Sequence, residues 1–166
     1  GTVEIADAIQ KHGGRAIVIS RGGPMVRHLD RLGATHYQLD VNTKNPFRWP
    51  QVRSRLKTIL SREKADLVHV RSRVPAWIAM PDAAALGIAT VSTVHGRFTT
   101  LSALKRIYNR KLLKTDHVIA ISNYVKDLIT SQYVDVKERL TVVHRGVDVD
   151  LFNPDNVNQT RIINFV

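Results

Sequence analysis

The chain has 166 residues, 43% of them hydrophobic, which is enough for one domain with a sizeable core and too short for two full domains. It has no cysteine and no apolar run near the roughly 20 residues that span a bilayer, which excludes disulfides, thiolate chemistry and a membrane-spanning helix. The formal net charge is +11, so the surface should attract phosphates on nucleic acid, anionic lipid or a small molecule.

Short β-branched runs alternate with helical patterns along the whole chain. We expect helices over residues 2–12, 24–33, 50–64, 75–86, 101–114 and 123–132, with Thr2 as the first N-cap. The expected strands cover residues 15–20, 35–39, 66–71, 88–94, 117–121 and 140–143. Such alternation predicts an α/β fold, a doubly wound Rossmann-like parallel sheet with helices on both faces.

A domain of this class normally begins with a strand that feeds a Gly-rich turn into the first helix. The chain opens directly on a helix, so we interpret Gly1 as the last residue of that turn and expect the first strand to be missing. Residues 144–154 run through a Gly turn, an acidic pair and Phe-Asn-Pro, as at an exit from one α/β domain. We therefore expect a Rossmann-like domain over 1–143, and a linker with the start of a C-terminal domain over 144–166.

Ligands of open α/β sheets bind at the carboxyl ends of the strands, so polar residues that follow strands are the candidates. Arg21 precedes a Gly pair and a helix N-terminus that can bind an anion, although a plain turn explains the same pattern. Arg71 and Arg73 offer two guanidiniums for phosphate or carboxylate. His95, followed by Gly96, is the strongest candidate, because its imidazole can exchange a hydrogen bond with a substrate hydroxyl or carbonyl.

Two further features have an ordinary and a functional interpretation. Ser122 either caps the helix that follows it or binds a substrate phosphate beside the same exposed amides. The helix over 101–114 has a dense basic surface, which is either a solvated face or a surface for an anionic bilayer or phosphorylated acceptor. Its main basic residues are Lys105, Arg106, Arg110 and Lys111.

Several common enzyme signatures are absent. The sequence has no complete G-x-G-x-x-G, no G-x-x-x-x-G-K-[ST], no H-E-x-x-H and no G-x-S-x-G. Dinucleotide oxidoreductases, P-loop NTPases, zincins and α/β-hydrolases therefore lack their motifs here. No ligand cluster suggests a metal site, and we expect no cofactor.

Six segments, in this order and spacing, carry a family resemblance: GTVEIADAI (1–9), DLVHVRSR (66–73), TVHG (93–96), DHVIAIS (116–122), VVHRGVD (142–148) and FNP (152–154). Together they resemble the N-terminal domain of GT-B glycosyltransferases of family 4. The resemblance implies a metal-independent, two-domain enzyme that moves a sugar from a nucleotide-diphosphate donor with retention of configuration. The N-terminal domain would hold the acceptor, and the C-terminal domain would bind the nucleotide sugar.

The same resemblance implies roles for individual positions. His95 would lie at the interdomain cleft near the transferred sugar, and Arg71 and Arg73 on the acceptor side. Gly1 would adjoin the Gly-Gly turn near the donor phosphates. The interdomain hinge would comprise Arg145, Gly146 and Asp148.

The pattern most resembles transferases of the lipopolysaccharide core and cell envelope, whose acceptors are anionic and membrane-embedded. The charge of +11 and the basic helix fit a glycan or glycolipid acceptor and an enzyme that is cytoplasmic and peripheral on the inner face of the cell membrane. On this interpretation nucleic acid is not a partner, and the chain alone should transfer no sugar.

Two other interpretations stay open. One is a non-enzymatic basic α/β module that binds nucleic acid or anionic lipid, which steeply salt-dependent binding would favour. Aromatic residues make up only 6% of the chain, which counts against this module. The other is a sugar-nucleotide epimerase or a related Rossmann enzyme, which would need the absent Gly fingerprint.

Overall fold

The computed structural model describes residues 1–96, 102–147, 149 and 153. The helices are α1 (Thr2–Lys11), α2 (Val26–Arg31), α3 (Trp49–Arg62), α4 (Arg73–Ala85), α5 (Ala103–Leu113) and α6 (Asn123–Thr130), with 3₁₀ helices η1 (Pro46–Arg48) and η2 (Val134–Arg139). The strands are β1 (Ile17–Ser20), β2 (Thr35–Gln38), β3 (Leu67–Val70), β4 (Ala89–Val94), β5 (His117–Ala120) and β6 (Leu140–Val142). All the expected helices and strands are present in the expected order, with ends displaced by at most two residues.

Three helix starts differ from expectation. Gly1, not Thr2, is the N-cap of α1. Helix α2 begins at Val26 instead of Pro24, because Gly22 and Gly23 have positive φ values and extend the turn. Helix α4 begins two residues before Pro75, which its first turn tolerates because an N–H there has no intrahelical partner.

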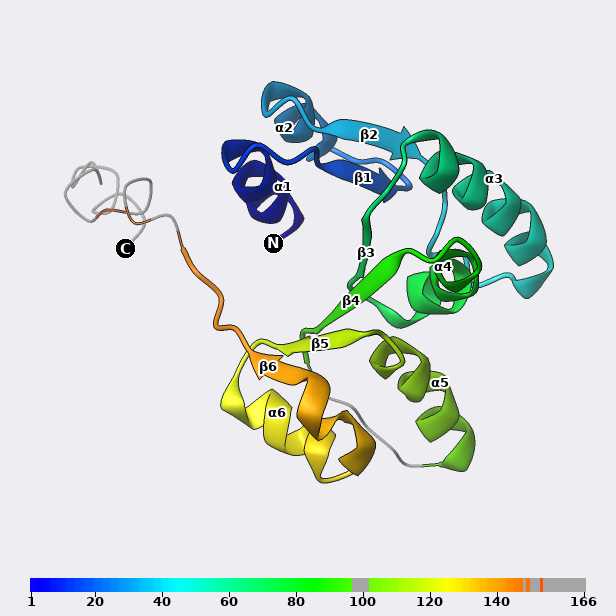
Figure 1. The fold of residues 1–166 in the computed structure, drawn as a ribbon, viewed down its shortest axis with the longest axis vertical. Coiled ribbons are helices and arrows are strands. Elements are labelled where there is room, and N and C mark those ends of the chain that lie inside the picture. The colour runs from blue at the N-terminus through cyan, green and yellow to red at the C-terminus, as the bar shows by residue number, and fades with distance from the viewer. Residues whose placement is uncertain (97–101, 148, 150–152, 154–166) are drawn as a thin grey trace, which may run out of the picture.

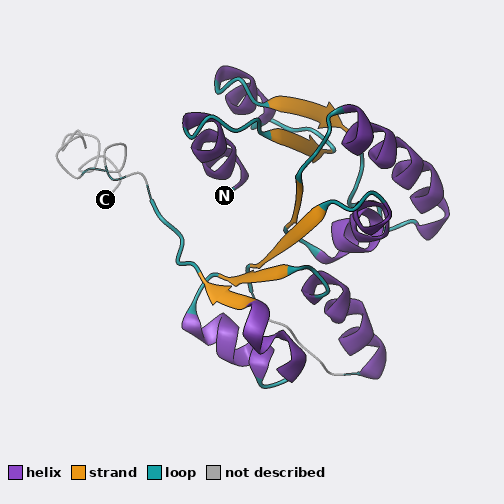
Figure 2. Cartoon of the chain, in the orientation of Figure 1, coloured by secondary structure: helices purple, strands orange, loops and turns teal. Residues whose placement is uncertain are grey.

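The described strands form two parallel sheets (Figure 2). One sheet has the order β1-β2 and the other β3-β4-β5-β6. Figure 1 shows the strands as one curved row in which β1 and β3 are consecutive. The expected first strand of a doubly wound domain would lie between them, and none of the described residues forms a strand there.

Helices cover both sides of this row of strands. Helices α1 and α2 contact each other at the upper left of Figure 1, and α4 contacts both α3 and α5 along the right. The largest fully buried side chains include Ile78 of α4, Leu113 of α5, Val94 of β4 and Val118 of β5, each at most 1% exposed. Fully burying one such side chain contributes about 1.5–3 kcal/mol.

The core fixes the strand ends that position the candidate site. Val94 and Ala120, the last residues of β4 and β5, are paired in register and are at most 1% exposed. The parallel direction of the strands brings Arg71, His95 and Ile121, which follow β3, β4 and β5, to one edge. This edge is where ligands bind in open α/β sheets.

Candidate active site

Arg71 and His95 are in direct contact at this edge. They follow the neighbouring strands β3 and β4, and Arg71 Nε donates a hydrogen bond to His95 Nε2 at 3.1 Å. Arg71 Nη1 also donates to Thr2 Oγ1 at 2.7 Å. Arg71 therefore links the end of β3 to His95 and to the start of α1.

Gly1 lies against the same guanidinium. A Cβ atom at position 1 would be 2.9 Å from Arg71 Nη2 and 3.1 Å from Nη1, closer than such atoms normally approach. The guanidinium ends a flexible side chain and could move, but then it would leave Thr2 or His95. The absence of a side chain at Gly1 thus allows Arg71 to occupy its observed position.

Arg145 completes the group from the other side of the imidazole. It follows β6, and its Nη2 atom lies 3.3 Å from His95 Nδ1. Both ring nitrogens of His95 therefore face a guanidinium. A neutral imidazole has a single acceptor nitrogen, so only one of the two contacts is a hydrogen bond at any moment.

These surroundings favour the neutral form of His95. Burial lowers the pKa of His95, and the charges of Arg71 and Arg145 lower it further, to about 4. The neighbouring His69 has its Nε2 atom 2.7 Å from Thr93 Oγ1. Its pKa is also lowered, first by burial and then by the charge of Arg71. At pH 7 His95 is a neutral hydrogen-bonding group between two cations.

This arrangement can bind negative charge next to a neutral imidazole. Among the described residues, neither Arg71 nor Arg145 forms an ion pair with a carboxylate. Guanidiniums bind phosphate and carboxylate oxygens through two parallel hydrogen bonds. The imidazole can donate to an oxygen or accept from a hydroxyl, but with a pKa of about 4 it is a poor proton donor at neutral pH.

Several other predicted residues lie outside this group. Arg73 is the first residue of α4, and its charge acts on Tyr133 instead. Burial raises the pKa of the Tyr133 phenol, and the charge of Arg73 partly opposes that rise. The hydroxyl of Ser122 accepts a hydrogen bond from the Val125 amide at 3.2 Å and is the N-cap of α6. In the structure, Ser122 therefore acts as a helix cap.

Gly96 adjoins His95 and is exposed. Among the described residues, no atom lies within 4 Å of where its Cβ would be. Gly146 is equally open, in a segment that Figure 1 shows leaving the domain after β6. Asp148 lies outside the described residues. Arg145, the first of the proposed hinge positions, contacts the candidate site.

The basic residues of α5 divide between two environments. Arg110 pairs with Asp135 at 2.8 Å, and the Lys111 ammonium lies 5.6 Å above the centre of the Trp77 ring. Lys105 and Arg106 are exposed beside Leu104 and Ile107, which are 80% and 61% exposed. A basic and apolar surface thus occupies only part of this helix.

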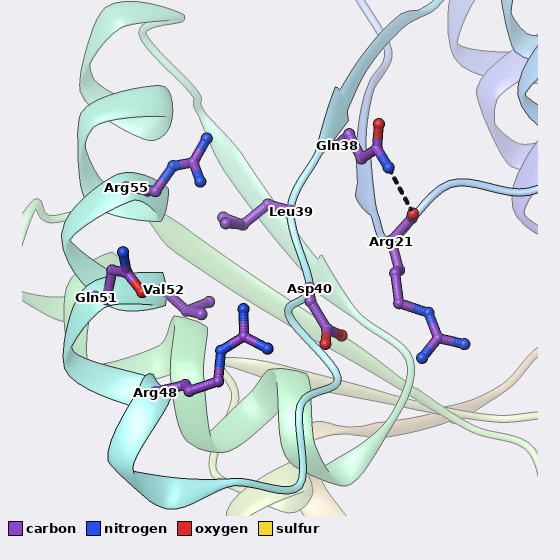
Figure 3. A pocket seen from close by; sticks show the side chains of 8 residues that line it. All are labelled: Arg21, Gln38, Leu39, Asp40, Arg48, Gln51, Val52 and Arg55. Carbon is purple, nitrogen blue, oxygen red and sulfur yellow. Dashed lines mark hydrogen bonds between the residues drawn. The ribbon is translucent and has the colours of Figure 1, made fainter.

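Three features of the structure were not predicted from the sequence. Thr2 contacts Arg71 through a hydroxyl that was interpreted only as a cap. Trp49, Trp77 and Tyr108 form a row of stacked rings with centroids 6.4 Å apart. A pocket at the ends of β1 and β2 is lined by Arg21, which the sequence indicated as an anion-binding residue, and by Arg48 and Arg55, which it did not (Figure 3). The spacing of Arg48 and Arg55 over two helical turns was the available signal for the pocket.

The described residues contain neither a metal-binding cluster nor a membrane-spanning helix. No three side chains of the metal-ligating types come together in the described ranges. None of the helices in the described part of the chain combines the length and the apolar character needed to cross a membrane.

The fold matches one half of a GT-B glycosyltransferase. A glycosyltransferase of Rickettsia africae ESF-5 matches 99% of this chain with a TM-score of 0.82 and 31% sequence identity. Anabaena Alr3699/HepE, solved in complex with UDP-glucose, also matches 99% of the chain, with a TM-score of 0.72 and 14% identity, and shows the fold alone.

The family follows from the sequence itself. The model of Glycosyltransferase Family 4 matches residues 1–151, and the chain belongs to that family. Spore coat protein SA of Bacillus subtilis (strain 168) is 23% identical over 101 residues, which are 60% of this chain and 26% of that protein. The chain spans less than half of its relatives, covering 43% of the Rickettsia protein and 46% of the Anabaena protein.

Proposed function

We propose that this chain is the acceptor-binding half of a retaining glycosyltransferase, which moves a sugar from a nucleotide-diphosphate donor to a cell-envelope glycan or glycolipid. Membership of family 4 and the likeness to a protein solved with UDP-glucose support a nucleotide-sugar donor. The observation that carries the proposal is the position of His95, with each ring nitrogen facing a guanidinium at the strand ends.

The geometry suits the charges of such a reaction. When the bond between sugar and nucleotide breaks, negative charge develops on the departing diphosphate. Arg71 and Arg145 are available to stabilise that charge, because no carboxylate of the described residues neutralises them. Neutral His95 would hold a hydroxyl of the transferred sugar by a hydrogen bond, without giving up a proton.

The exposed part of α5 supports the membrane side of the proposal. Lys105 and Arg106 would meet anionic headgroups, while Leu104 and Ile107 would enter the interface between headgroups and acyl chains. Each basic residue near an anionic surface contributes about 1 kcal/mol. These exposed side chains support a peripheral location of the enzyme on the inner face of the cell membrane.

The test is a transfer assay on the full-length protein with a panel of nucleotide sugars, measured as release of nucleoside diphosphate. His95→Ala should lower kcat/KM by about 100-fold or more, because a positioned hydrogen-bonding group is lost. His28→Ala, which removes an exposed imidazole from α2, is the matched control and should retain the wild-type rate.

Circular dichroism of both variants would establish that they fold. Full turnover by His95→Ala would refute the role of this residue. Tight nucleic-acid binding that falls steeply with salt, without any sugar transfer, would instead favour the basic-module interpretation.

A further inference from the structure

A second cationic site lies at the carboxyl ends of β1 and β2. The pocket is lined by Arg21 after β1, by Leu39 and Asp40 after β2, by Arg48 of η1 and by Arg55 of α3. In Figure 3 the arginines surround the end of β2, and Asp40 lies between Arg21 and Arg48. Buried Leu39 and Val52 form its floor, at 6% and 4% exposure.

The guanidiniums of this pocket are unneutralised, unlike their neighbours. On or beside α3, Arg53 pairs with Asp82 at 2.8 Å, Arg62 with Glu63 at 3.2 Å, and Arg15 with Glu63 at 2.7 Å. Within the described ranges no carboxylate pairs with the guanidiniums that line the pocket, and Asp40 pairs with no cation. Three positive groups against one negative group leave the pocket with a charge of +2.

We propose that this pocket binds the acidic group of a negatively charged sugar in the acceptor, a phosphate or a carboxylate. The inference rests on the proposed function, because it names the acceptor class of the same enzyme. Guanidiniums match both anions, and the Asp40 carboxylate suits the hydroxyls of an attached sugar ring. The cavity of about 150 Å³ has room for a charged substituent of a sugar.

The location fits an acceptor that extends beyond the reacting centre. The pocket and the His95 group both lie at the carboxyl ends of parallel strands, where α/β sheets bind ligands. The pocket belongs to the β1-β2 sheet and the His95 group to the other sheet, so they are separate sites. An anionic sugar held in the pocket would position a neighbouring part of the acceptor near His95.

The direct test is titration calorimetry of the 166-residue chain with glucose 6-phosphate, glucuronate, glucose and inorganic phosphate at low salt. Glucose 6-phosphate or glucuronate should bind saturably, and the tighter of the two identifies phosphate or carboxylate as the acid. The double variant Arg48→Gln/Arg55→Gln should weaken that binding at least tenfold. Arg27→Gln/Arg31→Gln on exposed positions of α2 removes the same charge and should change it less than twofold.

Three outcomes would overturn the inference. Glucose could bind as tightly as its acidic analogues, inorganic phosphate could bind as tightly as glucose 6-phosphate, or both double variants could lose the same affinity. Binding by this chain requires no sugar transfer, so a failed transfer assay refutes only the enzyme proposal. Transfer that proceeds equally in Arg48→Gln/Arg55→Gln with acidic and neutral acceptors refutes only the pocket.

Discussion

Acidification from pH 7 to pH 5 should destabilise the wild-type chain more than a His95→Gln variant. Burial, followed by Arg71 and Arg145, holds the pKa of folded His95 at about 4, whereas an unfolded histidine titrates near 6.5. Between these two values the unfolded chain binds a proton that the folded chain does not. The free energy of unfolding therefore falls as pH decreases through this window and levels off below pH 4.

The expected loss follows from these two pKa values. With about 6.5 for the unfolded chain and about 4 for the folded chain, proton linkage lowers the free energy of unfolding by about 2 kcal/mol between pH 7 and pH 5. His95 is only partly buried, so solvent screens its repulsion with the guanidiniums. We therefore expect a difference of about 1 kcal/mol between wild type and His95→Gln.

Urea unfolding followed by circular dichroism at pH 7 and pH 5 would measure this difference. Other titrating groups, including His69 with its lowered pKa, are present in both proteins and cancel in the comparison. His28→Gln, the same substitution at an exposed position of α2, controls for the loss of an imidazole. Equal losses in wild type and His95→Gln would show that the folded protein does not hold His95 neutral.

Two further predictions concern the contacts of single side chains. Arg71→Gln should raise the pKa of His95 only part of the way to the usual histidine value, because burial, the larger cause, and Arg145 both remain. NMR titration of the imidazole would detect this rise, and an unchanged pKa would exclude the influence of Arg71. Ser122→Ala should lower the free energy of unfolding, measured by urea titration, by about 1 kcal/mol, because the cap of α6 is lost. Ser61→Ala, at an exposed position of α3, is the control and should have little effect. Equal effects of the two substitutions would contradict the capping role of Ser122.

The order of helices and strands could be predicted because each strand is a short β-branched run between helical patterns. The helix starts were harder to predict. Pro24 and Pro75 both suit the first turn of a helix, but a sequence pattern does not say which residue of that turn the proline occupies. The positive φ values of Gly22 and Gly23 delay α2 to Val26, and α4 starts before Pro75.

The site was partly predictable for a related reason. Arg71 and His95 could be named because each follows a strand directly. Arg73 is only two residues from Arg71, yet it opens α4, and its charge acts on Tyr133 instead of His95. The contact of Arg145 with His95 joins residues 50 positions apart, which no local pattern encodes. Contacts of this kind depend on the strand order.

Burial lowers the pKa of His95 more than the charges of Arg71 and Arg145 do, and this order decides the protonation state of His95 once a ligand binds. An anion between Arg71 and Arg145 would offset their positive charge and remove the second cause of the lowered pKa. It would also cover the imidazole, and burial, the largest cause, would increase. Burial favours the neutral form whether or not the arginines are neutralised. His95 should therefore remain a neutral hydrogen-bonding group with substrate bound, and any proton needed by the departing or attacking oxygen must come from another group.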